Sequence, residues 1–484
     1  MLSLFIQASL KLKPCSTSNR CSLSYSSLKC ILEHIDANKR FLLAIRCSEI
    51  RHTDKQTPLH IDYLAFHYAY TIVNDTKYQI GIYRHFPADH TIPKFFKIIN
   101  DAGGAPFDLD RFGREDWEQE NVLIPGDIAT SNPLPIWRNR TGAIWNDYVE
   151  NSSRRLDELN NFQETPEIRR EKVRLQATVF SDALVQQDRP APFETLLQLS
   201  VFKGTKLRTE LMSGTKKRRE AMKYLLGKFL GERAFPIRAK TLDISPENSV
   251  IRLPLGVQFR VQNLYTTAHF SHVRSLPIFD PNSFPLHTIS IKGDHPFEIE
   301  ENHEHQTIQN AKVVVLIPQN TNLDGNWFDI VMKYQTNVNV QLKRCSFSVQ
   351  QFLMIVDMII RDQREIGTLY SFGSMEVNIL EKVVDALSQR PDAEIPLFQE
   401  ERRYVILPLS DTLCLSVFVE ARQQNFNNMM GNYAIWIQVK SKSELDAQRR
   451  RDIVGFIVVL AITGSFLGYC ARKLFVLCAS SSSS

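Results

Sequence analysis

Apolar residues near the start of the chain recur at helical spacing. Over residues 23–55 they fall three, four and seven positions apart, with one interruption at residues 36–38. The residues of this stripe are Leu28, Ile31, Leu32 and Ile35 before the interruption and Phe41, Leu42 and Ile45 after it. The pattern predicts a small module of short amphipathic helices, preceded by an unstructured extension over residues 1–22. A unit of this size cannot bury a large core alone, so we expect it to dock on its own chain or on a partner.

The pattern changes to alternation after residue 58. Apolar side chains alternate with polar ones around residues 59–66 and 78–83, and the polar pair Asn74 and Asp75 separates the two runs. Such runs predict a β-hairpin. Pro, Gly and Asp cluster further along and predict turns between short strands, so we expect a β-rich unit over residues 58–148.

Charged residues of both signs dominate the next segment, where aromatic residues are nearly absent. Mixed-sign runs of this kind mark solvent-exposed faces. We therefore expect a charged linker helix over residues 149–175, with a domain boundary in it.

The remaining body mixes helical stripes with short strand-like runs. Three helices are predicted: one whose apolar face contains Met222, Leu225, Leu226 and Phe229 and which ends at Gly231, one after Ser348, and one after Ser374. The strand-like runs are residues 241–244, 261–264, 287–291 and 312–317. Their spacing of roughly 20 to 25 residues is within the range of leucine-rich repeats. It predicts a repeat-like α/β body over residues 176–440, and an ordinary α/β domain is the alternative.

Residues 453–471 carry no charge, and basic residues flank them on both sides. A helix of this length covers about 28 Å, close to the thickness of a bilayer core. We expect a transmembrane helix here, a short tail over residues 472–484, and the lipid bilayer as a partner. More basic residues precede the span than follow it, which favours a single-pass membrane protein whose body faces the cytosol. Gly464 and Gly468 form a GxxxG spacing that permits close packing of membrane helices.

Together these patterns predict an α+β / α/β fold with four parts: a small helical module, a β-rich unit, a leucine-rich-repeat-like α/β body and a single C-terminal transmembrane helix. The chain has 484 residues, enough for two or three domains. Its formal charge of +5 is modest for that length and gives no reason to expect nucleic acid as a partner. The eight cysteines form no CxxC pair or dense framework, which favours reduced thiols. The acid-free start of the chain leaves a mitochondrial presequence as an alternative address.

Catalytic motifs for phosphate binding, nucleophilic hydrolysis or zinc hydrolysis do not occur in the sequence. Residues 108–113 imitate the start of a calcium loop, but Phe112 and Gln119 occupy ligand positions. His303 and His305 lie in a polar stretch that we interpret as a solvated loop. We therefore predict no catalytic residues, no metal site and no cofactor.

Several sequence blocks resemble a large protein family expanded in nematodes, which combines an F-box-like opening with a domain of unknown function. These blocks are LSYSSLKCILEHIDANKRFLLAIRCSEIRHTDKQTPLHIDYLAF, VNDTKYQIGIYRHFP, NDAGGAPFDLDRFG, LIPGD, EAMKYLLGKFLG, and IRLPLGVQFRVQNL with SFPLHTISI. The resemblance spans roughly residues 23–440.

Members of that family look like substrate adaptors of cullin-RING ubiquitin ligases. The resemblance implies that the F-box-like helices bind a Skp-type adaptor and, through it, a cullin, while the body captures an unknown protein substrate. The residues that match the adaptor-binding positions are Leu23, Leu28, Ile31, Leu32, Ile35 and Phe41. A membrane-anchored, non-enzymatic ligase adaptor is the expected function. A membrane-bound interaction scaffold without a ligase role and a hydrolase with an unrecognised site are the alternatives.

Overall fold

The structure is a computed structural model. It describes residues 24–116, 122–129, 143–212, 216–244, 250–267, 278–293, 306–318, 327–334, 337–395, 404–421 and 433–447. The chain divides into two compact units. The first contains residues 1–292 and 305–310, and the second contains residues 293–304 and 311–484.

The first unit begins with three short helices, where the apolar stripe predicts helical structure. They are α2 (Tyr25–His34), α3 (Ala37–Arg46) and α4 (Ser48–Lys55). The Ser24 hydroxyl caps α2 by accepting from the Ser27 N–H at 3.2 Å. The Asp36 carboxylate caps α3 by accepting from the N–H groups of Asn38 and Lys39. The interruption in the stripe is therefore a helix boundary.

The sheet of the first unit combines an antiparallel half with a parallel half. Its strands are β1 (His60–Phe66), β2 (Tyr70–Val73), β3 (Thr76–His85), β5 (Glu194–Lys203), β6 (Lys206–Met212), β7 (Ile237–Ile244), β9 (Phe259–Thr267) and β10 (Thr288–Gly293). They lie in the order β10-β9-β7-β1-β2-β3-β5-β6. The neighbouring strands β1, β2, β3, β5 and β6 pair antiparallel. On the other side of β1, the strands β7, β9 and β10 pair parallel. Two short strands, β4 (Ile128–Ala129) and β8 (Val250–Ile251), form a separate antiparallel pair.

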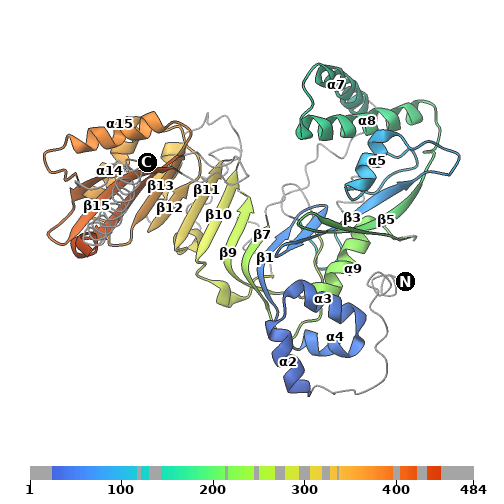
Figure 1. The fold of residues 1–484 in the computed structure, drawn as a ribbon, viewed down its shortest axis with the longest axis horizontal. Helices are drawn as coiled ribbons and strands as arrows, with labels where there is room; N and C mark the ends of the chain where they lie inside the picture. The colour runs from blue at the N-terminus through green and yellow to red at the C-terminus, as the bar shows by residue number, and fades with distance from the viewer. Residues whose placement is uncertain are drawn as a thin grey trace, which may run out of the picture. The chain divides into compact units, whose positions relative to one another are not determined.

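Several helices accompany this sheet (Figure 1). They are α5 (Lys94–Asp101), α7 (Ala143–Asn160), α8 (Pro166–Gln186), α9 (Arg218–Leu230), the 3-10 turn η2 (Pro281–Ser283) and α12 (Gln306–Gln309). Helix α9 contacts both β3 and α3, so it connects the helical module to the sheet. The predicted charged linker forms parts of α7 and α8, which contact each other, and α8 also contacts α5. These helices lie within the first unit, and the chain divides near residue 293 instead.

The second unit repeats the combination of parallel and antiparallel strands. Its strands are β11 (Val313–Pro318), β12 (Asn339–Leu342), β13 (Leu369–Ser374), β14 (Tyr404–Pro408), β15 (Leu413–Ala421) and β16 (Tyr433–Ser441), in the order β14-β15-β16-β13-β12-β11. Strands β11, β12 and β13 are parallel, and β13, β16, β15 and β14 are antiparallel. Its helices are α13 (Trp327–Lys333), α14 (Val349–Arg361) and α15 (Val377–Ser388). Ser348 and Gln351 form the predicted capping box of α14.

The predicted fold class needs correction in its repeat-like body. The predicted strand-like runs are strands, and they occur in β7, β9, β10 and β11. In both units, however, the parallel strands continue into antiparallel partners, which a leucine-rich solenoid does not contain. The mixed sheet depends on pairs distant in sequence, such as Ile61 with Ala239, and periodic spacing does not reveal such pairs.

The predicted transmembrane helix also needs correction. No helix in the described part of the chain is long and apolar enough to cross a membrane. The longest, α8, has 21 residues but carries charged side chains along its length. Residues 453–471, with Gly464 and Gly468, and the tail over residues 472–484 lie outside the described residues. An uncharged run in the sequence specifies hydrophobic length only, and no described helix supports the predicted single-pass membrane location or its bilayer partner.

Candidate functional site

The predicted adaptor-binding residues divide into two groups by exposure. Leu32 and Phe41 are buried in the chain's own core, with exposed fractions of 0% and 1%. Ile31 on α2 is 40% exposed, and Leu28 and Ile35 beside it are partly buried. Leu23 lies outside the described residues. Leu28, Ile31 and Ile35 therefore form one apolar edge along α2, with Ile31 exposed. Leu32 and Phe41 are buried inside the chain and are not accessible to a partner.

Phe41 anchors the helical module to the rest of the first unit. Its ring stacks on the ring of Phe229 in α9, with 4.3 Å between centroids and 5° between planes. Tyr78 of β3 meets Phe229 edge-on at 4.9 Å. Aromatic contacts of this geometry stabilise a core beyond the area that they bury. Phe41, one of the predicted adaptor-binding residues, is therefore engaged in contacts within the chain.

A buried group of ionic side chains fixes the same interface. Asp54 of α4 pairs with Arg40 of α3 at 2.7 Å and with Arg233 after α9 at 2.9 Å. The three side chains are at most 3% exposed. Backbone carbonyls of Asp54, Thr57, Pro58 and Phe229 accept the remaining hydrogen bonds that the two guanidinium groups donate. Each buried charge is thus paired and hydrogen-bonded, as a stable buried ion pair requires.

Burial changes the protonation behaviour of the neighbouring cations. Desolvation, with a contribution from Arg233, lowers the pKa of Lys55 to about 7, and the Lys55 ammonium donates to the carbonyl of Lys228 at 2.8 Å. Desolvation also lowers the pKa of Arg233 to about 10, although Asp54 opposes the shift. Because Lys55 approaches the carboxyl end of α9, its ammonium also compensates the carbonyl dipoles there.

Polar side chains complete the attachment of α3 to the β2–β3 turn. Asn38 donates to the Val73 carbonyl at 3.1 Å and accepts from the Tyr78 hydroxyl at 2.9 Å. Asn74 donates to Asp36 at 3.0 Å, and its backbone φ of 54° places it in the left-handed region that Asn tolerates. Burial raises the pKa of Tyr78 above its ordinary value, so this hydroxyl stays protonated as a donor.

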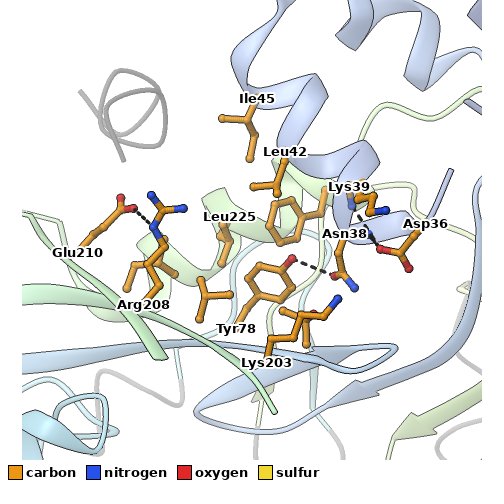
Figure 2. A pocket seen from close by; sticks show the side chains of 14 residues that line it. Asp36, Asn38, Lys39, Leu42, Ile45, Tyr78, Lys203, Arg208, Glu210 and Leu225 are labelled. Carbon is orange, nitrogen blue, oxygen red and sulfur yellow. Dashed lines mark hydrogen bonds and ion pairs between the residues drawn. The ribbon is translucent and has the colours of Figure 1, made fainter. Parts of the chain in front are cut away.

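A groove of about 190 Å³ lies beside these contacts (Figure 2). Leu42 and Ile45 of α3 form one side, and Leu225 of α9 and Tyr78 lie across from them. The rim is charged and includes Arg208, which lies 3.8 Å from Glu210. An apolar floor with a charged rim suits an apolar side chain of a partner.

The described residues contain no group of three or more His, Cys, Asp or Glu side chains that could hold a metal ion. His303 and His305 lie outside the described residues. In the loop that imitates a calcium site, the Asp110 carboxylate accepts from the N–H groups of Phe112 and Arg114, so it stabilises a turn.

The sequence interpretation missed the ionic group although one signal was present. Arg40 lies in the helical stripe that contains Ala37, Phe41 and Ala44, all of them buried. A cation at an apolar stripe position indicates a buried partner. The sequence does not identify that partner as Asp54, because the stripe gives no sign of the boundary between α3 and α4.

The fold and site define a mixed α/β protein of two units, the first of which carries a docked N-terminal helical module. Residues 217–376 match a family described as a domain of unknown function (DUF3557). The matched residues run from the start of α9 to the end of β13. They lie inside the body predicted for such a domain, residues 176–440, but cover only part of it. No curated protein and no solved structure matches the chain.

Proposed function

We propose that the chain is a non-enzymatic adaptor of a cullin-RING ubiquitin ligase, in which the α2 edge formed by Leu28, Ile31 and Ile35 binds a Skp-type adaptor. The mixed α/β body would then hold a protein substrate. The resemblance of the first sequence blocks to F-box-like proteins motivates this role.

The observation that supports the proposal most directly is the difference between the two sides of the module. One side is fixed internally through Phe41 and the group of Arg40, Asp54 and Arg233. The α2 edge instead leaves Ile31 at 40% and Tyr25 at 54% exposure. A rigidly held helix that presents apolar side chains matches the mode in which helical faces dock on partner proteins.

The second candidate is an interaction scaffold without a ligase role. The groove beside Leu42 and Ile45 favours it, because this groove can hold an apolar side chain without involving α2. The two candidates differ in which surface a partner needs.

Affinity purification of the full chain with mass spectrometry separates the two candidates. The test variant is Ile31→Asp, which places a charge on the exposed α2 edge. Leu207→Asp is the matched control, because Leu207 is 47% exposed, as Ile31 is exposed, but lies on β6 and not on α2. The ligase proposal expects a Skp-type adaptor and a cullin with the parent and the control but not with Ile31→Asp. Identical partners for all three chains, without a ligase subunit, would refute it in favour of the scaffold.

A further inference from the structure

The first unit contains a larger cavity, separate from the groove, with a volume of about 560 Å³. Its walls come from the start of β2, from β3, α5 and α8, and from the loops after α5. Apolar side chains such as Ile98, Ile99 and Val173 form part of the lining, together with Tyr68 and Tyr148. The volume is within the range of small-molecule sites.

Arg84 of β3 lines this cavity and is 3% exposed. Its guanidinium lies 4.5 Å from the ring centre of Phe96 and 5.7 Å from that of Phe193. Its Nε and Nη1 atoms have no hydrogen-bond partner among the described residues. Burial lowers the pKa of Arg84 to about 10, and the Glu115 carboxylate opposes this shift, so the side chain is charged at neutral pH. A buried cation with unused donors is costly unless an anion meets it.

Arg84 shares the cavity lining with four further arginines. Arg169, Arg170 and Arg174 of α8 and Arg114 also line the cavity, and Glu115 is the one acidic residue of the described lining. Two of these cations pair with carboxylates of residues outside the lining: Arg114 with Asp110 at 2.7 Å and Arg169 with Glu164 at 3.1 Å. The remaining excess of positive charge favours a ligand with more than one negative charge.

Three glycines make one wall of the cavity possible. A Cβ atom on Gly81 would lie 2.1 Å from the Gly103 carbonyl oxygen, and Gly103 and Gly104 have φ values of 109° and 84°. Only glycine adopts these conformations without strain. The loop after α5 therefore lies directly on β3, where Ile82 and Ala105 exchange two backbone hydrogen bonds of 2.8 Å.

We propose that this cavity binds a small organic phosphate monoester, with the phosphate at Arg84 and the arginines of α8 and the carbon body against the apolar and tyrosine side chains. A phosphate monoester carries a charge between about −1.5 and −2 at neutral pH and presents three acceptor oxygens. Guanidinium groups bind such oxygens with paired hydrogen bonds. The volume and the apolar walls exceed what inorganic phosphate alone would use.

Calorimetric titration of the full chain with phenyl phosphate tests the proposal. The expected result is binding that is at least about tenfold tighter than that of inorganic phosphate, benzoate or phenol, since each of these lacks either the apolar body or the second charge. Arg84→Met is expected to weaken binding about tenfold to a hundredfold, through the loss of charged hydrogen bonds. Arg174→Gln, at an exposed position, is expected to weaken it by a smaller factor. Arg189→Gln, an exposed arginine outside the cavity lining, is the control and should bind as the parent does.

Thermal unfolding without ligand distinguishes a binding role from a structural one. If Arg84 serves a ligand, Arg84→Met melts at the parent's temperature or above it, because the substitution removes a buried charge with unused donors. A lower melting temperature together with unchanged phenyl phosphate binding would overturn the proposal. Equal binding of phenol, or tighter binding of a phosphotyrosine peptide, would also overturn it, in favour of a neutral ligand or a protein ligand. None of these variants touches α2, so the result is independent of the ligase role.

Discussion

Replacing Asp54 with Asn removes the negative charge between two buried guanidinium groups while preserving the shape of the side chain. Arg40 and Arg233 would then remain buried, at 1% and 3% exposure, without a counter-charge. Removal of one partner from a buried ion pair costs about 3–5 kcal/mol, because the desolvated charge that remains is uncompensated. The Asp54 backbone carbonyl still accepts from both arginines, so the substitution isolates the effect of the carboxylate.

Hydrogen exchange measured by mass spectrometry is the suitable assay, because it reports local opening of α3, α4 and α9. We expect amides of these helices to exchange at least about a hundredfold faster in Asp54→Asn, since about 1.4 kcal/mol corresponds to a factor of ten. Asp188→Asn is the control, because Asp188 pairs with Arg111 at 2.6 Å on the surface, where both side chains are more than two-thirds exposed. An exposed pair contributes about 1 kcal/mol or less. Equal exchange in the two variants would refute the view that the ionic group holds the module in place.

Three further predictions concern the same unit. Phe41→Ala should lower the free energy of unfolding by about 3–5 kcal/mol in urea denaturation, since it removes a buried ring from the stack on α9. Gly81→Ala should lower the melting temperature through the clash with Gly103, whereas Gly227→Ala, in α9 with open space around it, should raise stability by about 0.5–1 kcal/mol. Stability should rise between pH 7 and about pH 10, because the unfolded chain keeps the Lys55 proton over this window while the folded chain, with a pKa of about 7, releases it. In Lys55→Met the urea midpoint should depend less on pH over this range. The same dependence on pH in both proteins would contradict the assignment to Lys55.

Local sequence signals predicted the local structure of this chain well. The stripe that contains Leu225 and Phe229 became α9, which ends at Gly231 as expected. Asn74 and Asp75 form the turn between β2 and β3. These features depend on neighbouring residues, whose preferences for capping, periodicity and positive φ can be read directly.

Features that join distant residues were not accessible in this way. Asp54 and Arg233 are separated by 179 positions, and β1 pairs with β7 across a similar interval. Neither residue alone indicates its partner. The repeat spacing likewise revealed the parallel strands but not the antiparallel strands that continue each sheet.

The candidate site was only partly predictable for a related reason. A helical stripe identifies apolar positions but does not say what covers each of them. Leu32 and Phe41 turned inward, while Ile31 stayed exposed. No sequence signal marked Arg84 as a candidate binding residue, because it lines a cavity that forms only when α5 and α8 pack together with β3.

Direct binding in solution is the simplest test of the proposal that the exposed α2 edge binds a Skp-type adaptor. The full chain, Ile31→Asp and the control Leu207→Asp would be titrated with a purified Skp-type adaptor in solution. We expect binding by the parent and by the control, with a loss of at least about a hundredfold for Ile31→Asp, because the charge would be buried in an apolar interface. Absence of binding by the folded parent chain, or equal binding by all three chains, would contradict it.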